Sequence, residues 1–157
     1  MDYIPNSELS EGNKMMYGNH LPNEVKFEDQ FSYDKEQYFT VVLFFDNLIR
    51  RDFLVILNRI RNIQDSMICD SIGYNLPENE DEDCEWKNSS CIELWWVAGT
   101  NDHSFLIDFK MFIECLRLSA KIWIKNNGIN DIQTISYIEK AIDEIELRYT
   151  NYHSNLS

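Results

Sequence analysis

The sequence predicts an α+β fold in which four main helices pack on a small antiparallel sheet or hairpin. Four segments carry apolar residues at the three- and four-residue spacing of a helix, and the segment CIELWWVAG alternates as a strand does. The chain has 157 residues, 44% of them hydrophobic, which is enough for one core of ordinary size. We therefore expect one acidic binding domain over residues 32–150, between a loosely ordered leader (1–31) and a polar tail (151–157).

The leader is rich in polar and turn-forming residues, and Pro5, Gly12, Gly18 and Pro22 interrupt any regular period. Its scattered apolar side chains are compatible with two arrangements. The leader can pack along the domain as an arm, or it can form a short strand near residues 24–27.

Two helices are predicted after the leader. Ser32 is suited to cap the first one, and Asp34 and Glu36 favour the positive end of its dipole. The second begins near Asp52, where apolar residues recur on one stripe and Arg59 lies off that stripe.

The middle of the chain changes character. Residues 67–74 predict a short strand or turn, because they are partly β-branched and are followed closely by Pro77. The segment NLPENEDEDCEWKNSS then places six acidic residues within positions 78–85. This pattern predicts an exposed loop that like-charge repulsion holds extended.

CIELWWVAG predicts the clearest strand, and SFLIDF across the GTNDH turn is its hairpin partner. We expect Trp96 and Trp123 in the core, and an interface role for Trp86 or Trp95. Strand alternation assigns two faces, with Ile92, Leu94 and Trp96 on one and Glu93, Trp95 and Val97 on the other.

Two further helices close the domain. Asp108 is expected to cap the third, and Gly128 suits a left-handed residue at its end. Asp131 opens the fourth, whose apolar stripe runs to Tyr149. The residues after Tyr149 are polar and are expected to fray.

Charge is concentrated in one part of the sequence. The net charge is −13, and residues 64–108 contain eleven acidic residues with Lys87 as their one cation, a local net of −10. Such a field repels nucleic acid and anionic membranes, and it attracts a cationic partner. Because no run of about 18 apolar residues and no secretory signal pattern is present, we expect a cytoplasmic location.

Catalytic and metal-binding chemistry has weak support in this sequence. Cys84 and Cys91 are too far apart for a structural zinc pair, and the acidic run lacks the glycine and spacing of an EF-hand. We therefore expect no metal, no cofactor and no enzymatic activity, with the four cysteines as free thiols. A minor alternative is a cysteine-dependent enzyme that uses Cys91 or Cys115 with His103 and Asp102.

The partner-binding surface is expected where acidic and aromatic side chains gather, because a charged rim around an aromatic anchor is a common design of tight interfaces. The predicted site residues are Glu78, Glu80, Asp81, Glu82, Asp83, Glu85, Trp86, Glu93, Trp95 and Asp102.

Four segments, in this order, resemble the immunity proteins of contact-dependent growth inhibition systems, particularly those that neutralise ribonuclease toxins. They are YFTVVLFFDNLIRRDFLVILNRI, IGYNLPENEDED, IELWWVAG and FKMFIECLRLSAKIWIKNN, and the resemblance covers roughly residues 36–145. The resemblance implies a cytoplasmic protein that covers the basic, RNA-binding cleft of a cognate toxin.

The functional hypothesis is therefore a stoichiometric inhibitor of a basic protein, in particular an immunity protein against a nuclease toxin. The alternative is an acidic nucleic-acid mimic or adaptor of phage or plasmid origin that binds a DNA-binding protein. The sequence leaves the oligomeric state open.

Overall fold

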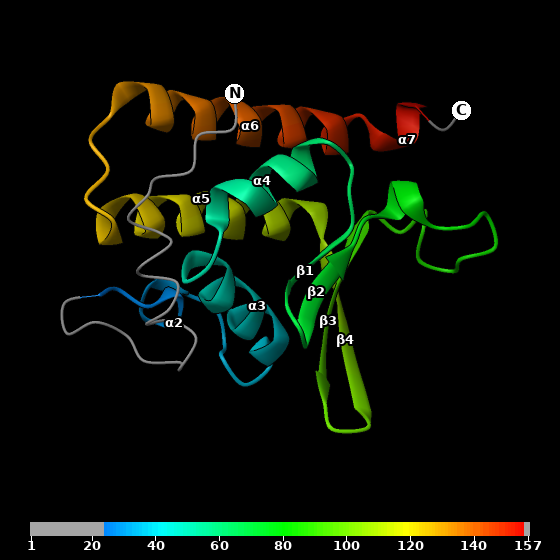
Figure 1. Ribbon diagram of the computed structural model, residues 1–157. Helices are drawn as coiled ribbons and strands as arrows, with labels where there is room; N and C mark the ends of the chain where they lie inside the picture. The colour runs from blue at the N-terminus through cyan, green and yellow to red at the C-terminus, as the bar shows by residue number, and fades with distance from the viewer. Residues whose placement is uncertain (1–23, 156–157) are drawn as a thin grey trace.

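Helices and strands alternate in blocks along the chain, as expected for an α+β fold (Figure 1). The computed structural model describes residues 24–155. Within this range four helices have nine or more residues, which confirms the predicted number of main helices. The helical elements are α2 (Phe27–Gln30), α3 (Phe39–Ile49), α4 (Phe53–Arg61), the 3-10 helix η1 (Pro77–Asn79), α5 (Phe109–Asn126), α6 (Ile132–Thr150) and α7 (Tyr152–Asn155).

The sheet is larger than the predicted hairpin. It has four antiparallel strands in the order β1 (Ser66–Cys69), β2 (Ile72–Asn75), β3 (Cys91–Ala98) and β4 (Asn101–Asp108). The segment expected to be a short strand or turn is thus a second hairpin. Its strands have only four residues each, which is too short for a clear period in sequence.

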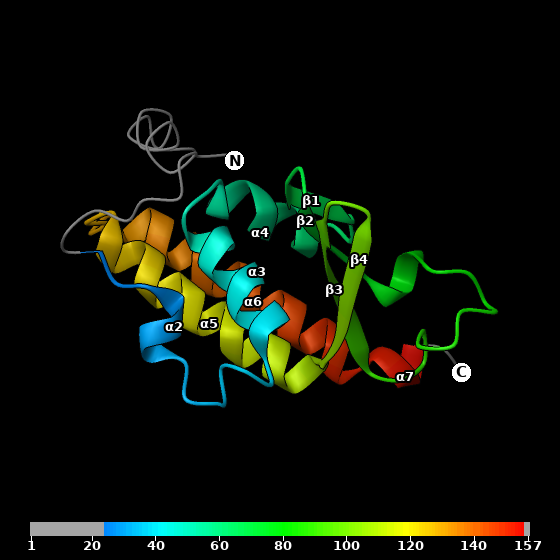
Figure 2. The ribbon, with the colours of Figure 1, turned by 90° about the horizontal axis from the view of Figure 1, so that it is seen from below.

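The helices cover one face of this sheet. Helices α3 and α5 contact β3 and β4, and Figures 1 and 2 show α3 and α4 on one side of the strands. Ile92, Leu94 and Ile107 point to that side and are fully buried. Helix α6 runs beside α5 and contacts α4, so the helices form their own packed layer.

The predicted starts of the two long helices are confirmed. Asp108 Oδ1 accepts a hydrogen bond from the Met111 amide at 2.8 Å, and Asp131 accepts from the Gln133 amide and from the Thr134 hydroxyl. These hydrogen bonds, the Thr134 hydroxyl first, lower the pKa of Asp131. Gly128, just past α5, has the left-handed φ of 60° that glycine tolerates.

The predicted start of the first helix is wrong. Ser32 does not cap a helix, because α3 begins at Phe39. Asp34 instead accepts hydrogen bonds from the amides of Glu36 and Gln37, which folds this segment into a turn. The start near Asp52 is confirmed, since α4 begins at Phe53.

Both ends of the described chain contribute to the core. Residues 24–27 form no strand; Val25 exchanges two hydrogen bonds with the Asn126 side chain, and Phe27 in α2 is fully buried. Tyr152, expected in a fraying tail, is only 4% exposed and packs against Phe109. Residues 1–23 and 156–157 lie outside the described range, so the expectations for them stay predictions.

No helix within residues 24–155 combines the length and the apolar character needed to cross a membrane.

Candidate protein-binding surface

The face of the sheet away from the helices is open. Cross-strand pairing aligns Met67, Gly73, Trp95 and Ser104 in one row across all four strands on this face. Trp95 is half-buried, while Met67 is 56% exposed. The strand alternation predicted for residues 92–97 is therefore confirmed, and it separates a core face from an accessible face.

A depression of about 520 Å³ lies around Trp95 on the open face. Three of the predicted site residues, Glu93, Trp95 and Asp102, are among the residues that line it. Its other lining residues are Asn75, Trp96, Val97, His103 and Ser104.

Trp95 lies directly against the backbone of β2 at Gly73. A Cβ atom at Gly73 would come within 2.4 Å of Trp95 Cζ2 and 2.7 Å of the Ser66 carbonyl oxygen, so no larger residue fits without a shift. Glycine at this position therefore makes room for the indole ring on the sheet surface. Trp95 thereby contacts the sheet on one side and borders the depression on the other.

Two carboxylates flank Trp95, and they differ in how they are held by neighbouring side chains. Asn75 Nδ2 donates a hydrogen bond of 2.7 Å to Glu93 Oε1, which fixes the glutamate on the open face. Asp102 lies in β4 opposite Val97, not in the turn where the sequence placed it, and its side chain is exposed. No lysine or arginine side chain is among the residues that line the depression.

Trp96 and His103 belong to the other face of the hairpin. Their rings stack with centroids 4.0 Å apart, and the Trp96 indole N–H donates to the Thr40 hydroxyl at 3.1 Å. Trp96 is only partly buried, at the edge of the core, whereas Trp123 is fully buried as predicted.

The loop that joins β2 to β3 carries the acidic run, and Glu78 anchors its start. Arg148 Nε lies 2.9 Å from Glu78 Oε2, and the Tyr149 hydroxyl donates to Glu78 Oε1 at 3.0 Å. The Arg148 guanidinium also donates to the carbonyls of Ile60 and Arg61 at the end of α4. The Glu78 carboxylate is therefore engaged within the protein, and its predicted role in partner binding stays a prediction.

Lys87 anchors the other end of the loop. It is only 8% exposed, its Nζ donates to the Glu80 carbonyl at 2.6 Å, and its own carbonyl accepts from the Tyr152 hydroxyl. The intervening backbone folds into successive turns; the Cys84 amide, for example, donates to the Asp81 carbonyl. The expectation of an extended loop is wrong, because these internal hydrogen bonds outweigh the repulsion between its charges.

The remaining predicted acids stay accessible. Asp81, Glu82, Asp83 and Glu85 are exposed, and Trp86 is half-buried. Glu82 lies 3.9 Å from Lys87, a distance at which an exposed pair contributes little. These four side chains form the acidic tip of the loop (Asp81, Glu82, Asp83 and Glu85).

Electrostatics connect the acidic tip with the open face of the sheet. The pKa of Glu80 is raised, first by partial burial and then by the negative charges of Asp65, Glu93 and Asp81. The charge of Glu80 is thus influenced by Asp81 of the acidic tip and by Glu93 of the Trp95 depression.

The residues of the alternative cysteine enzyme are not brought together. Cys91 pairs with Asp108 at one end of the β3–β4 ladder, while His103 pairs with Trp96, five residues away, or about 17 Å along the strand. Cys115 is buried in α5, and burial raises the pKa of its thiol to about 12. Asp102 and His103 point to opposite faces of β4. No group of three His, Cys, Asp or Glu residues within the described range is arranged to hold a metal ion.

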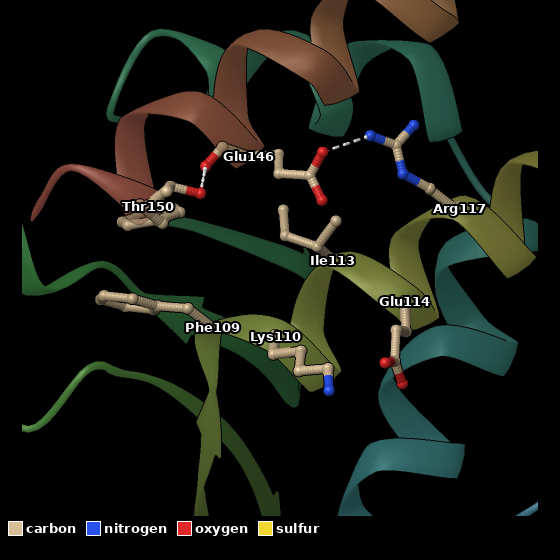
Figure 3. A pocket seen from close by; sticks show the side chains of 8 residues that line it. Phe109, Lys110, Ile113, Glu114, Arg117, Glu146 and Thr150 are labelled. Carbon is tan, nitrogen blue, oxygen red and sulfur yellow. Dashed lines mark hydrogen bonds and ion pairs between the residues drawn. The ribbon is translucent and has the colours of Figure 1, made fainter.

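A second depression, of about 350 Å³, lies between α5 and α6 (Figure 3). Phe109 and Ile113 are among the residues that line it, and so are Arg117 and Glu146. Arg117 Nη2 lies 2.9 Å from both Asp143 and Glu146, so this cation is already neutralised. We regard this depression as the weaker candidate for recognition.

Sequence reasoning missed the contributions of Gly73, Asn75 and Ser104 to the open face. Gly73 carried a readable signal, because an isolated glycine in a strand pattern indicates a close approach. The partner in that approach, Trp95, lies on a neighbouring strand and could not be identified without the pairing register.

Comparison of this chain with protein-family models, with curated proteins and with solved structures gives no significant match.

Proposed function

We propose that this protein binds a basic protein partner stoichiometrically, through the Trp95 depression and the acidic tip. In its most specific form, the proposal is an immunity protein that neutralises a cognate nuclease toxin, a ribonuclease of a contact-dependent growth inhibition system. The observation that carries the proposal is an open sheet face with an aromatic residue between two carboxylates and no lysine or arginine beside them.

Charge and shape both support a protein partner of positive charge. Lys87 is the one lysine or arginine within residues 64–108. Its ammonium group points inward to the Glu80 carbonyl, so it does little to offset the acids at the surface. A preorganised negative surface accelerates association with a basic protein and discriminates against acidic ones. Half-buried tryptophan beside exposed apolar side chains such as Met67 and Leu106 offers the desolvated centre that stable interfaces need.

Inhibition follows from the same chemistry if the partner is a nuclease. A nuclease cleft holds lysine and arginine side chains where the phosphates of RNA bind. Carboxylates of the acidic tip can pair with these cations through charge-assisted hydrogen bonds and exclude the substrate. The resemblance of four sequence segments to immunity proteins favours this form of the proposal.

The direct test mixes the protein with a candidate toxin domain and follows RNA cleavage. We expect cleavage to stop near a one-to-one ratio. Unchanged cleavage at a large excess of the protein would contradict the immunity function, and binding without inhibition would favour the adaptor alternative.

A charge-matched pair of variants tests the surface. Neutralising the acidic tip (D81N, E82Q, D83N and E85Q) should slow association roughly 10-fold or more at low salt and flatten its salt dependence. The control removes four charges elsewhere, at exposed Asp29, Glu36, Asp52 and Glu139. Equal slowing by both variants would show that net charge alone, and not the acidic tip, governs association.

A further inference from the structure

We propose that the Trp95 depression is a binding site for one arginine side chain of the partner, with the guanidinium stacked on the indole and hydrogen-bonded to Glu93 or Asp102. This inference rests on the proposed function, because it names the group that a basic partner would insert.

The indole is presented as a fixed platform. Gly73 lets the six-membered ring lie against the β2 backbone, where a Cβ atom would meet Cζ2 at 2.4 Å and Cε2 at 2.7 Å. A side chain that is already packed loses little conformational entropy when a ligand stacks on it. Tryptophan is also the aromatic residue that attracts cations most strongly.

The two carboxylates lie on either side of this platform. Glu93 is two residues before Trp95 on β3, which places it about 7 Å away along the strand. Asp102 is two residues from Ser104, the cross-strand partner of Trp95, and this diagonal separation is also about 7–8 Å. A cation above the indole is therefore within side-chain reach of a carboxylate in either direction.

The carboxylates have unused capacity for hydrogen bonds. Asn75 is the one described side chain that donates to Glu93, and it occupies Oε1, so Oε2 is available. The Asp102 carboxylate makes no hydrogen bond or ion pair within residues 24–155. Each carboxylate oxygen can accept donors from an incoming cation.

Arginine fits this arrangement better than the other candidates. Its planar guanidinium stacks on aromatic rings and donates in the plane to a carboxylate at the same time, whereas lysine is a strongly hydrated point charge. Its apolar stem can lie along Val97, which also borders the depression. An apolar side chain would leave both carboxylates without a cationic partner in a more desolvated site.

The test uses a short peptide whose one charged group is a central arginine, and its binding is followed by the indole N–H signals in a two-dimensional NMR spectrum. Each of the four tryptophans contributes one indole N–H signal, and W95F assigns that of Trp95. We expect saturable shifts of the Trp95 signal with a dissociation constant in the millimolar range, and little change at Trp123 in the core. The same peptide with citrulline in place of arginine keeps the planar shape without the charge, and it should cause at least 10-fold smaller shifts.

Variants distinguish this site from general attraction of cations. D102N should weaken binding of the arginine peptide several-fold. D70N, at an exposed position in the β1–β2 turn, should leave binding unchanged. An equal response to arginine and citrulline peptides, or an unshifted Trp95 signal, would overturn the inference.

Failure of this inference is distinguishable from failure of the proposed function. If the toxin is still inhibited, and inhibition depends on the acidic tip but not on Trp95, the arginine site is wrong and the proposed function stands. If the arginine peptide binds at Trp95 while no nuclease is inhibited, the site stands and the immunity function is wrong.

Discussion

The two faces of strand β3 contrast sharply within eight residues. On one face Ile92 and Leu94 are fully buried beneath the helices, and on the other Glu93 and Trp95 border an open depression. Alternation along the strand places neighbouring residues in these two environments. The core of the fold thus depends on one face of the sheet, while the other face leaves polar and aromatic side chains accessible.

The largest difference between the faces is expected in stability. L94A removes a fully buried side chain and should lower the free energy of unfolding by about 2–5 kcal/mol, because it leaves a cavity as well as losing burial. Urea denaturation at constant pH measures this loss. The matched change on the open face, V97A, should cost less than about 1 kcal/mol because Val97 is only partly buried. Similar losses for the two variants would remove the distinction between the faces.

Gly73 tests whether the open face is itself ordered. G73A places a Cβ atom against the Trp95 ring and the Ser66 carbonyl, and it should destabilise the protein by about 1–3 kcal/mol. In the double variant with W95A, part of this cost should disappear, since one of the two clashes is relieved. A double-mutant cycle from urea denaturation measures the coupling. Additive losses would show that Trp95 does not lie on Gly73.

The acidic loop repeats the same contrast between committed and free residues. E78Q weakens the pair with Arg148, whose two side chains are each 18% exposed, and it should cost about 1–3 kcal/mol. D83N removes a charge from the exposed tip and should change stability by less than about 0.5 kcal/mol. Thermal unfolding of the E78Q and D83N variants measures both changes in stability. A neutral E78Q variant would contradict the anchoring role of Glu78.

The smallest effect concerns the pH dependence of stability that arises from Glu80 in the acidic loop. Because the pKa of Glu80 is raised in the folded protein, its protonated form is favoured by folding. This contribution to stability is fully present below the ordinary pKa of glutamate and is lost as the pH rises through the raised pKa. E80Q should therefore stabilise the protein slightly at neutral pH, by less than about 0.5 kcal/mol, with the advantage vanishing in acid.

An NMR titration provides the independent check. E93Q removes one of the negative charges near Glu80 and should bring the pKa of Glu80 closer to its ordinary value. An unchanged pKa of Glu80 in E93Q would mean that the loop and the sheet face are electrically separate.

Local signals in the sequence predicted much of this fold. Asp108 and Asp131 are caps that act within three residues, and the alternation around Trp95 needs only its neighbours on the strand. Two of the failures depend on distant partners. Tyr152 is buried because it packs against Phe109 and donates a hydrogen bond to the Lys87 carbonyl. Glu78 forms an ion pair with Arg148, which lies seventy residues later in the sequence. The acidic composition of this segment alone could not show that Glu78 pairs within the protein while Asp83 stays exposed.

The inward orientation of Lys87 has a consequence for the solvent around the protein. With that ammonium group turned toward the Glu80 carbonyl, the charge of the acidic tip is balanced mainly by mobile sodium or potassium ions from the medium. A docking protein that brings its own cations would set these ions free. Part of the driving force for complex formation would then be the entropy of the displaced salt, and it would shrink as the ionic strength of the medium rises.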